Sequence, residues 1–325
     1  MTSKQRVIKA INFDKPDRVP VCMWNRDQLS GDVLVFELAL PRLTDVFKLA
    51  EGKLKSEWGY TWTKLADGTM GQPEKPVINN WGDLEHYSFP KLNRDRRTMG
   101  LDAFKNQAGS RYLLASLCIS GFNIYMFLRG FQNAMLDFVD KASEALELLD
   151  GILAFENQLI ALTAELGFGG IHFADDWGTQ HGLVIAPQLW RDIFKPRYQR
   201  QFALAHELGL HVWFHCCGNI TDIVPDFHEI DVDVMNISQP NVVDIPKVGT
   251  LLKSKQCFML PVSYQTVSLS GSPRDIKAEA KRLYNNLAAK DGGFIGYVED
   301  YSCMGMSEAN FKACVEVFRE LGYSN

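Results

Sequence analysis

The stretch CFMLPVSYQTVSLSGSPRDIKAEAKRLYNNLAAKDGGFIGYV, residues 257–298, holds two apolar runs with an amphipathic segment between them. The runs at its two ends, Cys257–Val262 and Gly293–Val298, are short and apolar, which is typical of buried strands. Ser272 suits the N-cap of a helix, and Pro273 its first position. Four apolar residues recur at the spacing of one helix face: Ile276, Ala280, Leu283 and Leu287. Strand, helix and strand in this order predict parallel strands joined by a right-handed crossover.

The same alternation extends to both sides of this unit. Further strand candidates are Val19–Trp24, Tyr112–Ile119, Gly170–Ala174, His211–Cys217 and Val232–Ile237, with an eighth near Trp58–Thr63. Helical patterns cover residues 143–166, 187–208, 273–289 and 307–321. About eight such units fit a closed (β/α)8 TIM barrel better than an open doubly wound sheet, and no GxGxxG or Walker-type loop follows any strand. We predict one α/β domain over residues 1–325, a (β/α)8 barrel with an N-terminal helical extension.

Composition and charge argue against several classes of protein. A hydrophobic fraction of 46% and a charged fraction of 22% suit a globular chain with a full core. The net charge of −5 and the lack of a basic run disfavour a nucleic-acid partner. We find no secretory signal and no segment apolar enough to cross a bilayer, and seven cysteines do not suit a disulfide framework. We therefore expect a cytoplasmic protein that does not bind membranes.

A candidate metal site lies at the end of one predicted strand, in HVWFHCCGN, residues 211–219. With a period of two, His215 and Cys217 face the inside of the barrel, whereas Cys216 faces the helices. An imidazole and a thiolate on one strand face can bind a single ion, and both are common zinc ligands. The pair is also compatible with an ordinary core, and a metal would need a further ligand.

The last strand, in GGFIGYVEDYSCMGM at residues 292–306, offers that further ligand. Cys303 matches a His/Cys zinc site best, because its sulfur is the softest ligand there. Glu299 and Asp300 are the alternatives, since carboxylates also bind zinc.

A second polar strand end, FADDWGTQHG at residues 173–182, supplies candidates for catalysis. Strand alternation turns Asp176 inward, where it can orient a ligand or, like Glu299, supply or remove a proton. Asp175 is equally compatible with capping or a loop ion pair. Side chains at or beyond strand ends are our candidates for substrate binding: Trp24, Asn25, Trp177, Asn236 and Ser263.

Two longer runs resemble a known family. The run DDWGTQHGLVIAPQLWRDIFKPRYQR, followed by FHCCGNITDIVPDF, is similar to the uroporphyrinogen decarboxylase superfamily. More specifically, it resembles the corrinoid-dependent methyltransferase branch, of O-demethylase or methylcobamide methyltransferase type. The similarity extends from KPDRVPV through GSPRDI to GGFIGYVED. Members of the superfamily fold as (β/α)8 barrels, which agrees with the strand count.

The resemblance implies a zinc site and a cofactor carried by another protein. The methyltransferase branch has a His-x-Cys pair on one strand and a later Cys, which His215, Cys217 and Cys303 match. Uroporphyrinogen decarboxylases hold substrate carboxylates with an arginine-rich RQAGR-type segment, whereas this chain reads MWNRDQLSG with Arg26 alone. The chain has no obvious DxHxxG segment for cobalamin, so we expect a separate corrinoid protein as partner. The family also favours a homodimer.

The resemblance thus implies a zinc-dependent methyltransferase that moves a methyl group from a small methylated substrate to the cobalt of the corrinoid protein. An aryl methyl ether is the favoured donor, and methanol and methylamine are the other candidates. Three alternatives remain open: transfer in the other direction to a thiol or tetrahydrofolate, a metal-free lyase of decarboxylase type, and a binding protein without catalysis.

Overall fold

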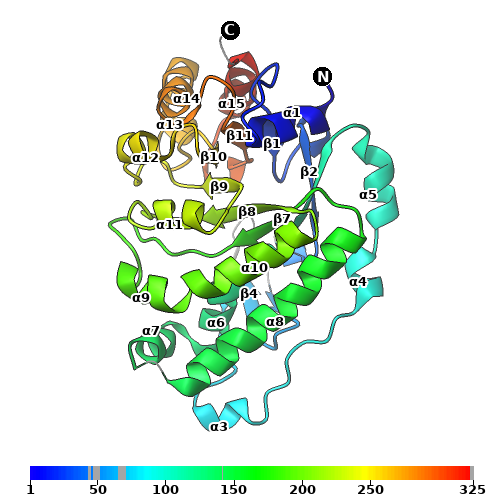
Figure 1. Ribbon diagram of the computed structural model, residues 1–325, viewed down its shortest axis with the longest axis vertical. Coiled ribbons are helices and arrows are strands. Elements are labelled where there is room, and N and C mark those ends of the chain that lie inside the picture. Colours follow the sequence, from blue (N-terminus) through cyan, green and yellow to red (C-terminus); the bar gives the residue numbers. More distant parts are fainter. Residues whose placement is uncertain (43–44, 47–51, 65–70, 141, 323–325) are drawn as a thin grey trace.

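Eight parallel strands close into a barrel in the computed structural model, which describes residues 1–42, 45–46, 52–64, 71–140 and 142–322 (Figure 1). Around the barrel the order is β1, β11, β10, β9, β8, β7, β6 and β2. The strands are β1 Val21–Met23, β2 Val33–Glu37, β6 Tyr112–Ser116, β7 Gly170–Ala174, β8 His211–Cys216, β9 Val234–Ile237, β10 Cys257–Leu260 and β11 Phe294–Val298. This closure confirms the predicted (β/α)8 fold class.

Helices connect these strands and cover the outside of the barrel (Figure 1). Helix α1, Ser3–Ile11, precedes β1. The others are α3 Trp81–Leu84, α4 Arg94–Thr98, α5 Leu101–Ala108, α6 Gly121–Arg129, α7 Phe131–Asp140, α8 Ser143–Glu165, α9 Pro187–Ile193, α10 Lys195–Glu207, α11 Val224–Glu229, α12 Ile245–Leu252, α13 Val267–Ser270, α14 Pro273–Leu287 and α15 Glu308–Glu320. The short 3-10 turns η1, Gln28–Ser30, and η2, Ser302–Met304, lie in loops.

The predicted start of α14 is confirmed in detail. The hydroxyl of Ser272 accepts a hydrogen bond from the N–H of Asp275, whose carboxylate accepts one from the N–H of Ser272. The four residues of its apolar face are fully buried. The helical pattern over residues 187–208 forms two helices, α9 and α10, because Pro196 has no N–H and fits the first turn of a new helix.

The prediction of the eighth barrel strand near Trp58–Thr63 is wrong. That segment contributes β4, Thr61–Lys64, to a small antiparallel sheet with β3, Gly52–Lys55, and β5, Gln72–Pro73. Every second side chain of β4 is buried, as expected for a sheet with one covered face. The eighth barrel strand is instead β2, a mostly buried run that pairs in parallel with β1 and β6.

The barrel has an inner and an outer apolar layer, and β8 contributes to both. Trp213 points inward and packs in one cluster with Tyr112 and Met259. Phe214 and Cys216 point outward and belong to the larger cluster between strands and helices. This alternation is the one predicted for residues 211–217, and it directs His215 and Cys217 into the barrel mouth.

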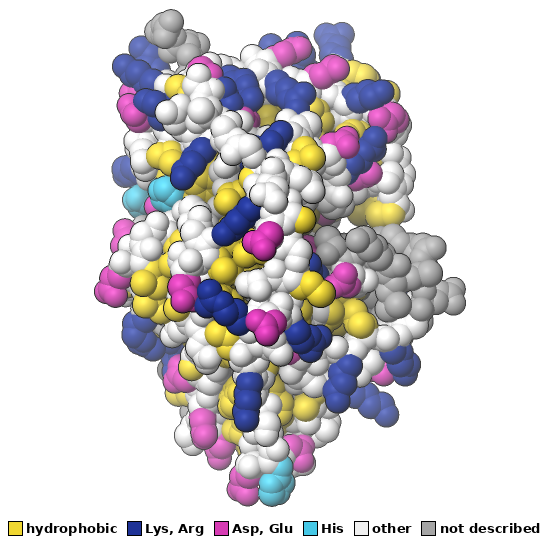
Figure 2. All heavy atoms as spheres, turned by 90° about the vertical axis from the view of Figure 1, so that its right-hand side faces the viewer, with side chains coloured by type: hydrophobic (Ala, Val, Ile, Leu, Met, Phe, Trp, Pro, Cys, Tyr) yellow, Lys and Arg dark blue, Asp and Glu magenta, His cyan; other side chains and the backbone are white. Residues whose placement is uncertain are grey.

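Charged side chains of both signs lie among hydrophobic ones on one face of the molecule (Figure 2). On the face shown in Figure 2, basic and acidic side chains are interspersed, and neither sign forms a continuous patch. Within the described part of the chain, no helix has both the length and the apolar character needed to cross a membrane.

Candidate active site and metal centre

A cavity of about 480 Å³ lies at the carboxyl ends of the barrel strands, where (β/α)8 enzymes place their chemistry. Side chains from β7, β8, β9 and β11 and from the loop after β6 form its floor and walls. Trp62 of β4 and the β5 segment of the small antiparallel sheet line it as well. The small sheet thus contributes to the cavity without belonging to the barrel.

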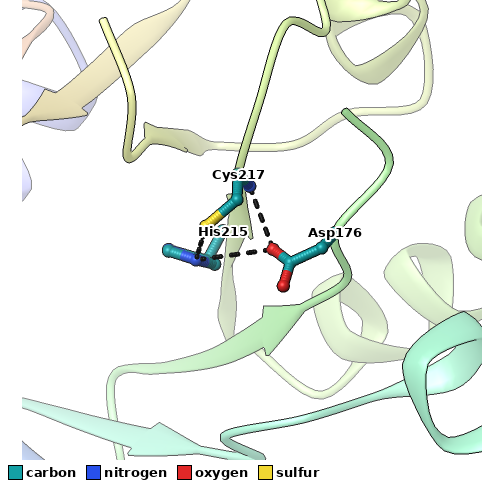
Figure 3. A group of neighbouring side chains, drawn as sticks. All are labelled: Asp176, His215 and Cys217. Carbon is teal, nitrogen blue, oxygen red and sulfur yellow. Dashed lines mark hydrogen bonds and ion pairs between the residues drawn. The ribbon is translucent and has the colours of Figure 1, made fainter. Parts of the chain in front are cut away.

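Asp176, His215 and Cys217 meet in this cavity as a group of possible metal ligands (Figure 3). The Sγ atom of Cys217 lies 3.4 Å from Nε2 of His215, and Oδ1 of Asp176 lies 3.9 Å from the same nitrogen. One ligand atom from each residue lies within 4.8 Å of the other two. Ligands about 2.1 Å from a tetrahedral ion lie about 3.5 Å apart, so the group has the dimensions of a zinc site.

The hydrogen bonds around His215 determine which nitrogen faces the group. The amide nitrogen of Asn236 donates to the carbonyl oxygen of Met259 at 2.9 Å, so the amide oxygen faces His215. That oxygen lies 2.7 Å from Nδ1 of His215, which must therefore carry the proton. The lone pair of Nε2 is left facing Cys217 and Asp176. An imidazole held in this way is the usual form of a metal-binding histidine.

Two glycines bring Asp176 beside Cys217. A Cβ atom on Gly218 would lie 2.1 Å from the carbonyl carbon of Gly178, so the loops after β7 and β8 approach this closely only without side chains. As a result, Oδ1 of Asp176 accepts a hydrogen bond of 3.0 Å from the N–H of Cys217. Asn123 holds Asp176 from the other side, with its amide oxygen 3.3 Å from the N–H of Asp176.

The electrostatics of the group favour a bound cation. Burial and the neighbouring carboxylate of Asp176 both raise the pKa of the Cys217 thiol well above its usual value. A divalent cation reverses this effect, because it stabilises the thiolate and offsets the carboxylate. Sulfur, imidazole nitrogen and carboxylate oxygen together form a donor set that fits zinc.

Glu299 lies in the same cavity with two tyrosine partners. The hydroxyls of Tyr297 and Tyr301 each donate to Oε2 of Glu299 at 2.7 Å. Burial raises the pKa of Glu299 more than these hydrogen bonds lower it. The residue is therefore suited to giving or taking a proton.

The structure brings together six of the ten predicted site residues. The residues that line the cavity are Trp24, Asp176, His215, Cys217, Asn236 and Glu299. Cys303, our first choice of third ligand, is exposed in η2 and lies outside this lining. Asp176 takes the place beside the His/Cys pair that we assigned to Cys303.

Three predicted substrate-binding residues also lie outside the cavity lining. Trp177 is fully buried and stacks on Phe122 at 4.0 Å, in the apolar layer beneath the helices. Asn25 is exposed and accepts a hydrogen bond from the N–H of Asp300, and Ser263 is buried and donates to Asn241. Each of these side chains follows a strand end, but the chain has turned by then, so alternation no longer predicts its direction.

Sequence reasoning missed the tyrosines and Asn123. Tyr297, Glu299 and Tyr301 are two residues apart, and this alternation was a signal that they share one face. Asn123 lies in the first turn of α6, and no local pattern connects it with Asp176 in the loop after β7.

Lysine and arginine are missing from the described lining of the cavity. Arg26, the single arginine of the MWNRDQLSG segment, forms an ion pair with Glu308 and lies over the ring of Phe311. It is therefore engaged at the surface. Arg129 likewise forms a buried ion pair, with Asp137.

Comparisons with known proteins agree with the barrel fold. The model of a family described as uroporphyrinogen decarboxylase matches residues 64–321. A methyltransferase from Methanosarcina mazei is 16% identical, with a TM-score of 0.74 over 98% of this chain and 99% of that chain. A D-psicose 3-epimerase from Clostridium cellulolyticum is 11% identical, with a TM-score of 0.41 over 90% and 86% of the two chains. A search of curated proteins gives no match. At 16% identity the methyltransferase structure shows the barrel fold alone.

Proposed function

Because the chain belongs to the uroporphyrinogen decarboxylase family, we propose that it is a zinc-dependent methyltransferase acting with a separate corrinoid protein. It moves a methyl group from a small methylated substrate to the cobalt of that corrinoid. The observation that carries the proposal is the group formed by Asp176, His215 and Cys217 at the barrel mouth. The likeness to a methyltransferase from Methanosarcina mazei supports the same reaction class.

The residues of the site have different roles in the proposed reaction. His215 would hold the ion through Nε2, Cys217 through its sulfur and Asp176 through a carboxylate oxygen. Zinc bound there would supply a Lewis acid for an oxygen leaving group, or would hold a thiol acceptor as thiolate. Glu299 gives or takes the proton that an oxygen leaving group requires. The aromatic side chains of the cavity exclude water from the reacting methyl group.

The donor is a small methylated compound of one of three kinds. An aryl methyl ether was favoured from the sequence, with methanol and methylamine as the other candidates. All three are small enough for a cavity of about 480 Å³. A cytoplasmic location and a homodimer are part of the same proposal.

The cavity disfavours the reaction after which the family is described. Decarboxylation of a tetrapyrrole requires basic groups for several substrate carboxylates, and the described lining carries Asp176 and Glu299 without a lysine or arginine. A substrate with several carboxylates is repelled there. We therefore rank the metal-free lyase below methyl transfer.

Zinc analysis combined with a cobalt assay tests the proposal. The purified protein is expected to hold about one zinc per chain, as sites of this donor type do. With reduced cob(I)alamin and a panel of the three donor classes, it is expected to give the absorption spectrum of methylcobalamin. Cys217→Ala is expected to lose both zinc and transfer.

Cys216→Ala is the matched control, because the neighbouring sulfur points into the outer apolar layer. It is expected to keep its zinc. Zinc binding without methyl transfer in either direction supports the binding-protein alternative, and transfer from methylcobalamin to a thiol supports the opposite direction. A protein that neither binds zinc nor alters the cobalt spectrum refutes the proposal.

A further inference from the structure

The carboxylates in the described lining of the cavity are not matched by lysine or arginine. The described lining includes the carboxylates of Asp176 and Glu299 but no lysine or arginine. An anionic ligand therefore meets repulsion here, whereas a cation is attracted.

A metal ion on the ligand group cancels only part of this charge. The carboxylate of Asp176 and the sulfur of Cys217 together balance a divalent cation. Glu299 is then left as the unmatched carboxylate of the described lining. Tyr297 and Tyr301 both donate to its Oε2, which leaves Oε1 without a partner among the hydrogen bonds of the described residues.

Aromatic rings surround this carboxylate. The ring centroids of Trp24 and Tyr297 lie 6.0 Å apart, and the angle between the two ring planes is 52°. Tyr301 stacks on Tyr264 at 4.5 Å and extends the aromatic surface. The faces of such rings are negative and attract cations, and aromatic cages are a common means of binding quaternary ammonium groups.

We propose that the cavity selects a small methylated onium cation, such as a quaternary ammonium compound, as its methyl donor. Glu299 is the counter-charge, and Trp24, Tyr297 and Tyr301 are the aromatic walls. The proposal rests on the methyl transfer proposed above and decides among its donors. It ranks methylated amines first and places methoxybenzoates, which carry a carboxylate, last.

Methyl transfer from an onium cation to cobalt requires no proton. The methyl carbon forms a bond to cobalt with an electron pair of the reduced corrinoid, and the carbon–nitrogen bond breaks. Both electrons of that bond stay on nitrogen, so a neutral amine leaves. Glu299 therefore remains a carboxylate throughout, whereas an oxygen leaving group would need a proton from it.

A pair of ligands with one shape and different charge tests the proposal. Choline and its neutral carbon analogue 3,3-dimethylbutan-1-ol are titrated into the purified protein by calorimetry. We expect choline to bind about tenfold more tightly or better, a difference of about 1.4 kcal/mol. Equal affinity for the two ligands overturns the proposal. Tighter binding of vanillate, an anionic aryl methyl ether, overturns it as well.

Three variants test which side chains cause the preference for choline. Glu299→Gln is expected to remove the preference for choline while leaving the affinity for the neutral analogue unchanged. Trp24→Leu is expected to weaken choline binding without touching the carboxylate. Asp300→Asn is the control, because this neighbouring carboxylate lies outside the cavity lining and pairs with Arg26.

A preference for choline that survives Glu299→Gln refutes the assigned counter-charge. These titrations need no corrinoid, so they fail or succeed independently of the methyl-transfer assay. Selective choline binding without cobalt methylation supports the assigned ligand class and contradicts the proposed reaction.

Discussion

Replacing Asn236 by leucine is expected to weaken zinc binding by about 10- to 100-fold, or about 1.4–2.8 kcal/mol. Asn236 is buried, and its contact with Met259 turns the amide oxygen toward Nδ1 of His215 at 2.7 Å. Leucine keeps the volume but removes the acceptor. The imidazole then loses the partner that orients its ring, and its Nδ1–H is left buried without a hydrogen bond.

Zinc affinity is measured by competition with a chromophoric chelator, and the thermal unfolding midpoint shows whether the variant is folded. Asn236→Asp is the matched control, because it keeps an acceptor for Nδ1–H while giving up the donor to Met259. Its affinity is expected to stay within about threefold of the wild type. A folded leucine variant that binds zinc as tightly as the wild type refutes the assignment of Nε2 as the ligand atom.

Three further predictions concern the third ligand, a buried ion pair and the pH dependence of stability. Asp176→Asn is expected to lower zinc affinity by about tenfold or more, whereas Cys303→Ser is expected to leave zinc affinity unchanged. A zinc titration in which Cys303→Ser has the larger effect contradicts this assignment of the third ligand. Asp137→Ala leaves the guanidinium of Arg129 buried without its carboxylate partner. Denaturant titration is therefore expected to show that the free energy of unfolding falls by about 3–5 kcal/mol. A fall of less than about 1 kcal/mol disagrees with a buried ion pair. The hydrogen bond that His206 donates to the carboxylate of Asp233 raises the pKa of His206, so this contact stabilises the fold fully below about pH 6.5 and is lost as the pH rises through the raised pKa. His206→Gln is therefore expected to be less stable than the wild type near pH 6 and equally stable at about pH 9, and a difference that is constant across this range contradicts the linkage.

Local sequence patterns predicted the structure correctly where the direction of the side chains repeats along the chain. The period of two in β8 placed His215 and Cys217 on one face, and the structure confirms that both line the cavity. The apolar face and capping residues of α14 were equally local and equally well predicted. Strand β2 was missed because a short apolar run has no distinctive period, and its pairing with β1 and β6 is a contact between distant segments.

Proximity across the barrel was harder to predict than orientation along a strand. Cys303 was chosen as a ligand for its chemistry, but the loop after β11 leaves it exposed. Asp176 was recognised as an inward carboxylate, yet its contact with Cys217 depends on two glycines in different loops. Trp177 follows Asp176 directly, and its burial under the helices shows how sharply the direction changes at a strand end.

By itself, the sequence determined the alternation of strands and helices, hence the barrel, and the inward direction of an imidazole and a sulfur on β8. These follow from backbone geometry, in which side-chain direction repeats at a fixed interval. The tertiary structure decided which carboxylate stands beside that pair and which aromatic rings surround Glu299. Those positions depend on how separate loops pack at the mouth of the barrel, and no interval along the chain encodes that packing.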